Sequence, residues 1–127
     1  MSAPALSAPL RRLLGLPGVA ALSGASLGPF VAHGVSALFF TGNSARYPEI
    51  DDLAVVLPEL MKAFPGVFRL GVVDPDQERE LAVRFKVTVR PTLVFLRDGT
   101  VLGSLPRMRD WAVYLDGIAA LLATEPV

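Results

Sequence analysis

The stretch RPTLVFLRDGTVLGSL, residues 90–105, decides how this chain is expected to fold. Its first part, Thr92 to Arg97, is an apolar run of the length of a strand. Asp98-Gly99 is a strong signal for a two-residue hairpin turn. The run from Val101 to Leu105 is therefore expected to return antiparallel. The pattern predicts a terminal β-hairpin that is preceded directly by a proline.

Upstream of this hairpin, short apolar runs alternate with segments that have helical patterns. The segment Asp51–Phe64 carries apolar residues three and four positions apart, which predicts a helix with one buried stripe, kinked at Pro58. Interior strands are expected at Val35–Thr41 and Val67–Val73, and a short edge strand at Val19–Leu22. Further helices are expected over Pro9–Leu16, from an N-cap at Ser26 to an end at Gly34, over Gln77–Phe85 with Asp74 or Asp76 as its cap, and over Arg109–Ala123.

Strands that alternate with helices predict a fold of the α/β class. We expect a three-layer α/β/α sandwich, with two parallel crossovers and the antiparallel hairpin making its central sheet mixed. The length of 127 residues suits a single domain over residues 1–127, of which residues 1–8 are expected to be flexible.

The composition excludes several classes of function. The chain has 12 basic and 12 acidic side chains, so its net charge of zero argues against nucleic acid as a partner. It contains no cysteine and one histidine, which excludes thiolate nucleophiles and metal sites built from sulfur or several histidines. His33 is expected at a helix end. No cofactor, metal site or catalytic group is predicted.

The N-terminal sequence allows two interpretations. Arg11-Arg12 followed by Leu13-Leu14 resembles a twin-arginine export signal, but glycines and prolines interrupt the apolar stretch that follows. Cleavage there would also remove elements that the fold can use. No run approaches the ~20 apolar residues that span a bilayer, so we expect a soluble, cytoplasmic protein without membrane insertion.

The proline and the hairpin resemble the cis-proline hairpin of the thioredoxin superfamily, carried here by Arg90-Pro91-Thr92 and Asp98-Gly99. The resemblance implies a thioredoxin-like fold and a cis Arg90–Pro91 bond. It aligns the C-x-x-C motif with Ile50-Asp51-Asp52-Leu53, and the buried carboxylate of thioredoxins with about Leu38. Since the thiols and the carboxylate are all absent, the protein is expected to be redox-inactive and not an enzyme.

Within this superfamily the chain is similar to the hydrogenase accessory family called HyaE, HupG or HoxO. The similarity lies in residues 47–52, 58–65 and 90–95, and in Trp111. It implies a non-catalytic chaperone in the maturation of nickel–iron uptake hydrogenases. The implied partners are the small-subunit precursor with its twin-arginine signal peptide, and possible further partners are other hydrogenase accessory proteins. The alternative is a structural thioredoxin-like subunit of a larger complex.

A groove beside the proline could hold an extended peptide by β-augmentation, which needs no sulfur. Acidic side chains at its lip would pair with the arginines of a signal peptide, with Asp74 and Asp76 expected nearby. Asp51 and Asp52 have an alternative explanation, because acidic residues in the first turn also favour the helix dipole. The predicted partner-binding residues are Glu49, Ile50, Asp51, Asp52, Arg90, Pro91 and Thr92.

Residues around the start of the last helix are assigned simpler roles. Trp111, Tyr114 and Leu115 are expected mainly in the core, with part of this set available as a partner surface. Arg107 and Arg109 are expected to face water.

Overall fold

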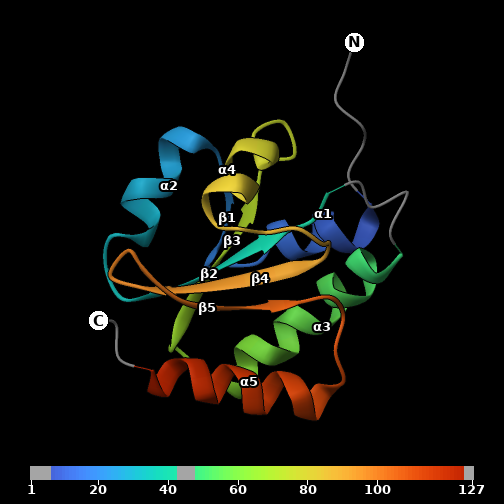
Figure 1. The fold of residues 1–127 in the computed structure, drawn as a ribbon. Coiled ribbons are helices and arrows are strands. Elements are labelled where there is room, and N and C mark those ends of the chain that lie inside the picture. The colour runs from blue at the N-terminus through green and yellow to red at the C-terminus, as the bar shows by residue number, and fades with distance from the viewer. Residues whose placement is uncertain (1–6, 43–47, 125–127) are drawn as a thin grey trace.

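The computed structural model describes residues 7–42 and 48–124, which form a five-stranded sheet flanked by helices (Figure 1). The order of the strands across the sheet is β1-β3-β2-β4-β5. The strands are β1 (Val19–Leu22), β2 (Val35–Phe40), β3 (Phe68–Val73), β4 (Thr92–Arg97) and β5 (Thr100–Pro106). The helices are α1 (Ala8–Leu14), α2 (Gly24–Val31), α3 (Glu49–Ala63), α4 (Glu78–Arg84) and α5 (Trp111–Ala123).

The sheet is mixed, as expected. β3 pairs in parallel with both β1 and β2, whereas β4 pairs antiparallel with β2 and with β5. The predicted hairpin is confirmed: Asp98 and Gly99 have φ values of 50° and 82°. Two positive φ values are what a tight hairpin turn of the type favoured by strand twist requires.

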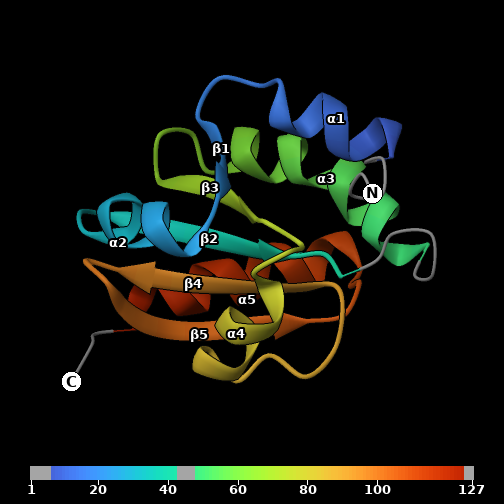
Figure 2. The same cartoon turned by 90° about the horizontal axis from the view of Figure 1, so that it is seen from above.

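Each face of the sheet has its own apolar core, so the three-layer arrangement is confirmed (Figure 2). Successive residues of a strand point to opposite faces. Ala37 and Phe39 therefore pack under α1, α3 and α5, whereas Leu38 and Phe40 pack under α2 and α4. The strands β2 and β4 are buried on both sides, which explains why their sequences are almost continuously apolar.

The structure corrects several predicted helix ends. Ser7, expected to be flexible, caps α1, and its hydroxyl accepts a hydrogen bond from the backbone N–H of Leu10. Ser23, and not Ser26, is the N-cap of α2, and the two serines form a reciprocal capping box. These hydroxyls satisfy N–H groups that the first turn of a helix leaves without a partner.

The predicted caps of α4 are also wrong. Gln77 is the N-cap residue of α4 and makes no side-chain cap. Asp74 instead accepts a hydrogen bond from the backbone N–H of Asp76, which closes the turn between β3 and α4. At the start of α3 the helix begins at Glu49, two residues before its predicted start.

Candidate functional site

The loop that joins α4 to β4 has the geometry expected from the sequence resemblance. The Arg90–Pro91 peptide bond is cis, as predicted. The buried Thr92 donates a hydrogen bond from its hydroxyl to the carbonyl of Val89, at 2.8 Å. The carbonyl of Pro91 accepts the N–H of Arg107, at 2.7 Å. The loop is thus held both from within and from the segment that follows β5.

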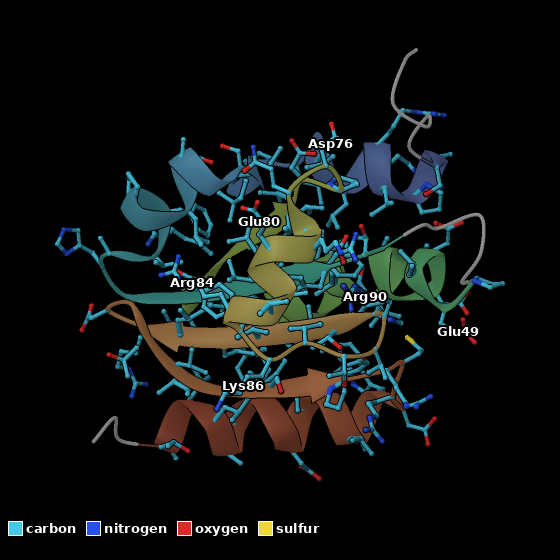
Figure 3. All side chains as sticks on the ribbon, turned by 45° about the horizontal axis from the view of Figure 1, so that its top comes forward. Glu49, Asp76, Glu80, Arg84, Lys86 and Arg90 are labelled. Atoms are coloured by element: carbon cyan, nitrogen blue, oxygen red, sulfur yellow. The ribbon has the colours of Figure 1, made fainter. Side chains whose placement is uncertain are left out.

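A hollow of about 670 Å³ opens beside this proline. It is formed where four segments meet: the end of β2, the start of α3, the loop before β4 and the residues after β5. In Figure 3 Glu49 and Arg90 lie on the same side of the molecule. The lining residues are Gly42, Glu49, Thr88, Val89, Arg90, Pro91, Arg107 and Met108.

The side chain of Arg90 is directed to a buried carboxylate, which the sequence analysis did not single out. Glu78, the first residue of α4, is 4% exposed and accepts a charge-assisted hydrogen bond from Nε of Arg90. The two carboxylate oxygens of Glu78 also accept the N–H of Gly42, at 2.9 and 2.8 Å. One carboxylate therefore joins α4, the proline loop and the end of β2.

Gly42 is shaped for this contact. Its φ is +62°, and a Cβ at this position would lie 2.9 Å from Cγ of Arg90. A side chain there would be strained by the backbone and would press Arg90 away from Glu78. The glycine thus allows the end of β2 to approach the arginine closely.

The backbone of Arg90 is left open by these contacts. Among residues 7–42 and 48–124, neither its N–H nor its C=O has a hydrogen-bond partner. Both groups belong to a loop that lines the hollow. An extended chain placed there can pair with them as an added strand does.

The acidic residues predicted at the lip of the groove fall into different environments. Glu49 is exposed and lines the hollow. Asp51 is half-buried and accepts a hydrogen bond from the hydroxyl of Ser7, at 2.6 Å, so it ties α3 to the start of α1. Asp52 is exposed but does not line the hollow, and Ile50 is fully buried and has no surface for a partner.

Asp74 and Asp76, expected near the groove, do not belong to it. Asp74 lines a separate, mostly apolar hollow between α1, β1 and β3, which shares no residue with the first one. Asp76 lies in the turn before α4, away from Glu49 in Figure 3. The acidic lip is therefore smaller than the sequence indicated.

The positions that align with the sulfur atoms of C-x-x-C belong to the core. Ile50 and Leu53 are both 0% exposed, and so is Leu38 at the position aligned with the carboxylate. Among the described residues no three His, Asp or Glu side chains form a group that could hold a metal ion. In the same part of the chain no helix has the length and apolar character to cross a membrane.

The segment after β5 contributes more to the site than its sequence suggested. Arg107 is exposed, as expected, but it lines the hollow and has a φ of 68°. Its carbonyl accepts the hydroxyl of the buried Tyr114, which in turn accepts the N–H of Arg109, at 3.2 Å. Burial raises the pKa of Tyr114. No sequence signal marks Arg107, because its bond to Pro91 is a backbone contact.

Trp111 differs from its expected place in the core. Its side chain is 44% exposed and lies beside Glu59, Lys62 and Ala63 of α3. Tyr114, expected in the core with it, is fully buried. Because Trp111 is the first residue of α5, it lies at the end of the helix, where the core no longer covers it.

Comparison with known proteins places the chain in a family. The model of the family described as "Hydrogenase-1 expression protein HyaE" matches residues 10–114. The chain is 48% identical over 88 residues to the hydrogenase expression/formation protein HupG of Rhizobium leguminosarum bv. viciae, covering 69% of this chain and 59% of that protein. It is 47% identical over 88 residues to HoxO of Cupriavidus necator, covering 68% and 55%.

A solved structure agrees. The crystal structure of a putative hydrogenase expression/formation protein HupG from Rhodopseudomonas palustris is 42% identical, with a TM-score of 0.59, and covers 82% of this chain and 95% of that one. The matched region spans less than two thirds of the length of the curated relatives. With the thioredoxin-like fold, the cis-proline and these matches together, the chain belongs to the HyaE family of hydrogenase expression proteins.

Proposed function

We propose that this protein acts in hydrogenase expression and formation as a non-catalytic, cytoplasmic chaperone. Its partner is the precursor of the small subunit of a nickel–iron uptake hydrogenase, which it binds through the twin-arginine signal peptide. The observation that carries this proposal is that the backbone N–H and C=O of Arg90 have no hydrogen-bond partner among the described residues and belong to a loop that lines the hollow. The residues aligned with the reactive cysteines of thioredoxins are buried aliphatic side chains.

The geometry favours binding without reaction. An extended peptide in the hollow would form main-chain hydrogen bonds with Arg90, and these depend little on the peptide sequence. The residues aligned with the reactive sulfurs, Ile50 and Leu53, are buried aliphatic side chains. They offer no nucleophile to a bound chain, so the peptide is held and released unchanged.

Charge would supply the preference for an arginine pair. Glu49 lines the hollow, and Asp52 is exposed on the same first turn of α3. Carboxylates form bidentate, charge-assisted hydrogen bonds with guanidinium groups. Since both are exposed, their contribution is expected to weaken as salt is added.

The test is a titration of the protein with the small-subunit precursor, with and without its signal peptide, at low and high salt. The combined variant Glu49→Gln/Asp52→Asn should weaken binding of the complete precursor several-fold at low salt, because charge-assisted hydrogen bonds are lost. A truncated precursor without the signal should bind poorly to either protein.

Glu80→Gln is the matched control, because Glu80 is also an exposed acidic residue in the first turn of a helix. Combined with Asp76→Asn, at a second exposed residue that does not line the hollow, it removes the same two negative charges away from the site (Figure 3). Equal binding by the wild type, the Glu49/Asp52 variant and the Glu80/Asp76 variant would contradict the groove interpretation. So would equal binding of the precursor with and without its signal.

A structural subunit of a larger hydrogenase-related complex is the second candidate, and the exposed Trp111 favours it. Trp111 is 44% exposed on α5 and lies beside Glu59 and Lys62 of α3. If this surface anchors the protein, Trp111→Ser should abolish co-purification with hydrogenase subunits, whereas the Glu49/Asp52 variant should have no effect. Val101→Ser, at a similarly exposed position on β5, is the control.

A further inference from the structure

Resting on the proposed peptide-binding function, we propose that Arg107 is a specificity-determining residue of the groove. It selects an acidic side chain in the bound peptide, at a position close to the residue that pairs with Arg90. The partner is thus an extended segment that carries an acidic residue in addition to basic ones. The proposal is carried by the place of Arg107 on the wall of the hollow and by its charge, which has no acidic partner among the residues that the structure describes.

Arg107 is built into the same site as the proline. Its N–H donates to the carbonyl of Pro91 at 2.7 Å, and its own carbonyl accepts the hydroxyl of the buried Tyr114 at 3.1 Å. Both backbone groups are therefore anchored, one to the peptide-binding loop and one to the core. The side chain starts from a fixed point beside the open backbone of Arg90.

The charge of Arg107 is available to a ligand. Its side chain is exposed and has no acidic partner within the described part of the chain. The other arginine that lines the hollow, Arg90, is neutralised by Glu78. Among the residues that the structure describes, the net positive charge at the wall of the hollow therefore comes from Arg107.

Glu49 supplies the opposite charge on the same hollow, yet it does not pair with Arg107. Within residues 7–42 and 48–124 neither charge has an ion-pair partner, and two such charges of opposite sign at one hollow favour a ligand that carries both complementary signs. Glu49 suits a basic residue of the ligand and Arg107 an acidic one. The arrangement sets the direction of the bound chain as well as its composition.

The backbone conformation at Arg107 supports a role for its side chain. A φ of 68° lies in the left-handed region, which glycine and asparagine occupy at lower cost than arginine does. Such a conformation at a longer residue often marks a functional position. Arginine contributes here a guanidinium that binds carboxylate in a bidentate manner.

The position of the acidic residue along the ligand is limited by reach. An extended chain advances about 3.3 Å per residue, so the guanidinium can meet a carboxylate only within about two or three residues of the one paired with Arg90. Selection should therefore be confined to a narrow window of the peptide. A general attraction of acidic peptides would show no such window.

The experiment measures the Kd of synthetic peptides, capped at both ends, that contain an Arg-Arg pair in an otherwise uncharged sequence. A single Asp is moved along the peptide one residue at a time, and Asn and Lys replace it at each position. Because the ends are capped, the scanned side chain is the peptide's one carboxylate. Wild type, Arg107→Glu, Arg107→Asn and, as control, Arg84→Glu are compared at low salt.

For the wild type, Asp should bind about three- to ten-fold more tightly than Asn within one short window, the range of a charge-assisted contact at a partly exposed site. Arg107→Asn should remove this preference, and Arg107→Glu should reverse it in favour of Lys. Arg84→Glu changes an exposed arginine that does not line the hollow and should leave the scan unchanged. Urea midpoints that are not lowered in the variants would show that the changes act on binding and not through loss of the fold.

The outcomes separate the two proposals. If the arginine-pair peptides bind but the Asp scan is flat, or if Arg107→Glu keeps the wild-type preference, the role of Arg107 is refuted and the peptide groove stands. If no peptide binds the wild type at any position of the Asp, the proposed function itself fails, and the role of Arg107 fails with it.

Discussion

Glu78 offers the sharpest test of how the site is built. Its carboxylate is buried and accepts hydrogen bonds from two segments: the side chain of Arg90 and the backbone N–H of Gly42. Glu78→Ala would remove all three contacts and leave both donors without their partner. The carboxylate side chain is 5% exposed and that of Arg90 is 20% exposed.

The expected cost follows from this burial. Removing one partner of a buried ion pair costs about 3–5 kcal/mol, and an unsatisfied buried N–H costs about 1–3 kcal/mol. Because one fifth of the Arg90 side chain is exposed, water can solvate part of the freed charge. We therefore expect Glu78→Ala to lower the free energy of unfolding by about 3 kcal/mol, somewhat less than the lower end of the sum at about 4 kcal/mol.

Urea denaturation followed by circular dichroism measures this cost. With a slope of roughly 1.5 kcal/mol per molar urea, the midpoint should fall by about 2 M. Glu80→Ala is the control, since Glu80 lies on the same helix turn but is exposed. It should change the free energy of unfolding by less than about 0.5 kcal/mol.

A double-mutant cycle with Arg90→Ala tests whether the two residues act as a pair. We expect the loss in free energy of unfolding of the double variant to be smaller than the sum of the two single losses by at least about 1 kcal/mol. The reason is that each single variant leaves the other residue without its ion-pair partner. Simple addition of the two costs, or a Glu78→Ala midpoint equal to that of Glu80→Ala, would refute the reasoning.

Three further predictions concern the frame around the site. Burial raises the pKa of Tyr114, so the folded state holds the phenol proton more firmly than the unfolded state. The free energy of unfolding should therefore be unaffected below pH ~10 and fall as the pH rises above it. Urea midpoints across that range should fall less for Tyr114→Phe than for the wild type. Gly71→Ala should cost about 1–3 kcal/mol in thermal or urea unfolding, because the added Cβ collides with Leu22. Ser7→Ala should cost about 1 kcal/mol by removing the cap of α1 and its bond to Asp51, and an unchanged midpoint would contradict this role.

Much of the fold could be predicted because its signals are local. The apolar runs of β2 and β4 gave strands whose ends differ from the prediction by at most one residue. Asp98-Gly99 specified the hairpin, since few residue pairs accept two positive φ values. The cis-proline followed from the resemblance, and not from the local pattern, because most prolines that precede strands are trans.

The candidate site could be predicted only in outline. Arg90, Pro91 and Glu49, which line the hollow, could be singled out because they belong to a recognisable loop and helix start, whereas Thr92 is buried behind the loop. Glu78 was missed, although it is the buried centre of the site, because a glutamate in a first helix turn is usually exposed. Trp111 was wrongly expected in the core, because helical spacing indicates which face of a helix is buried but not where along the helix the core ends.

The sequence by itself determined the order of the elements, the mixed sheet, the loss of sulfur chemistry and the place of the proline. These depend on residues that are near one another in the chain or on residue types that are absent. The tertiary structure decided which charged side chains are bound within the protein and which face the hollow. Ser7 meets Asp51 across 44 positions, Glu78 meets Gly42 across 36 and Arg90 across 12. Pairs so far apart leave no periodic trace, so only packing shows that Asp51 and Arg90 are engaged, whereas Glu49 and Arg107 face the hollow.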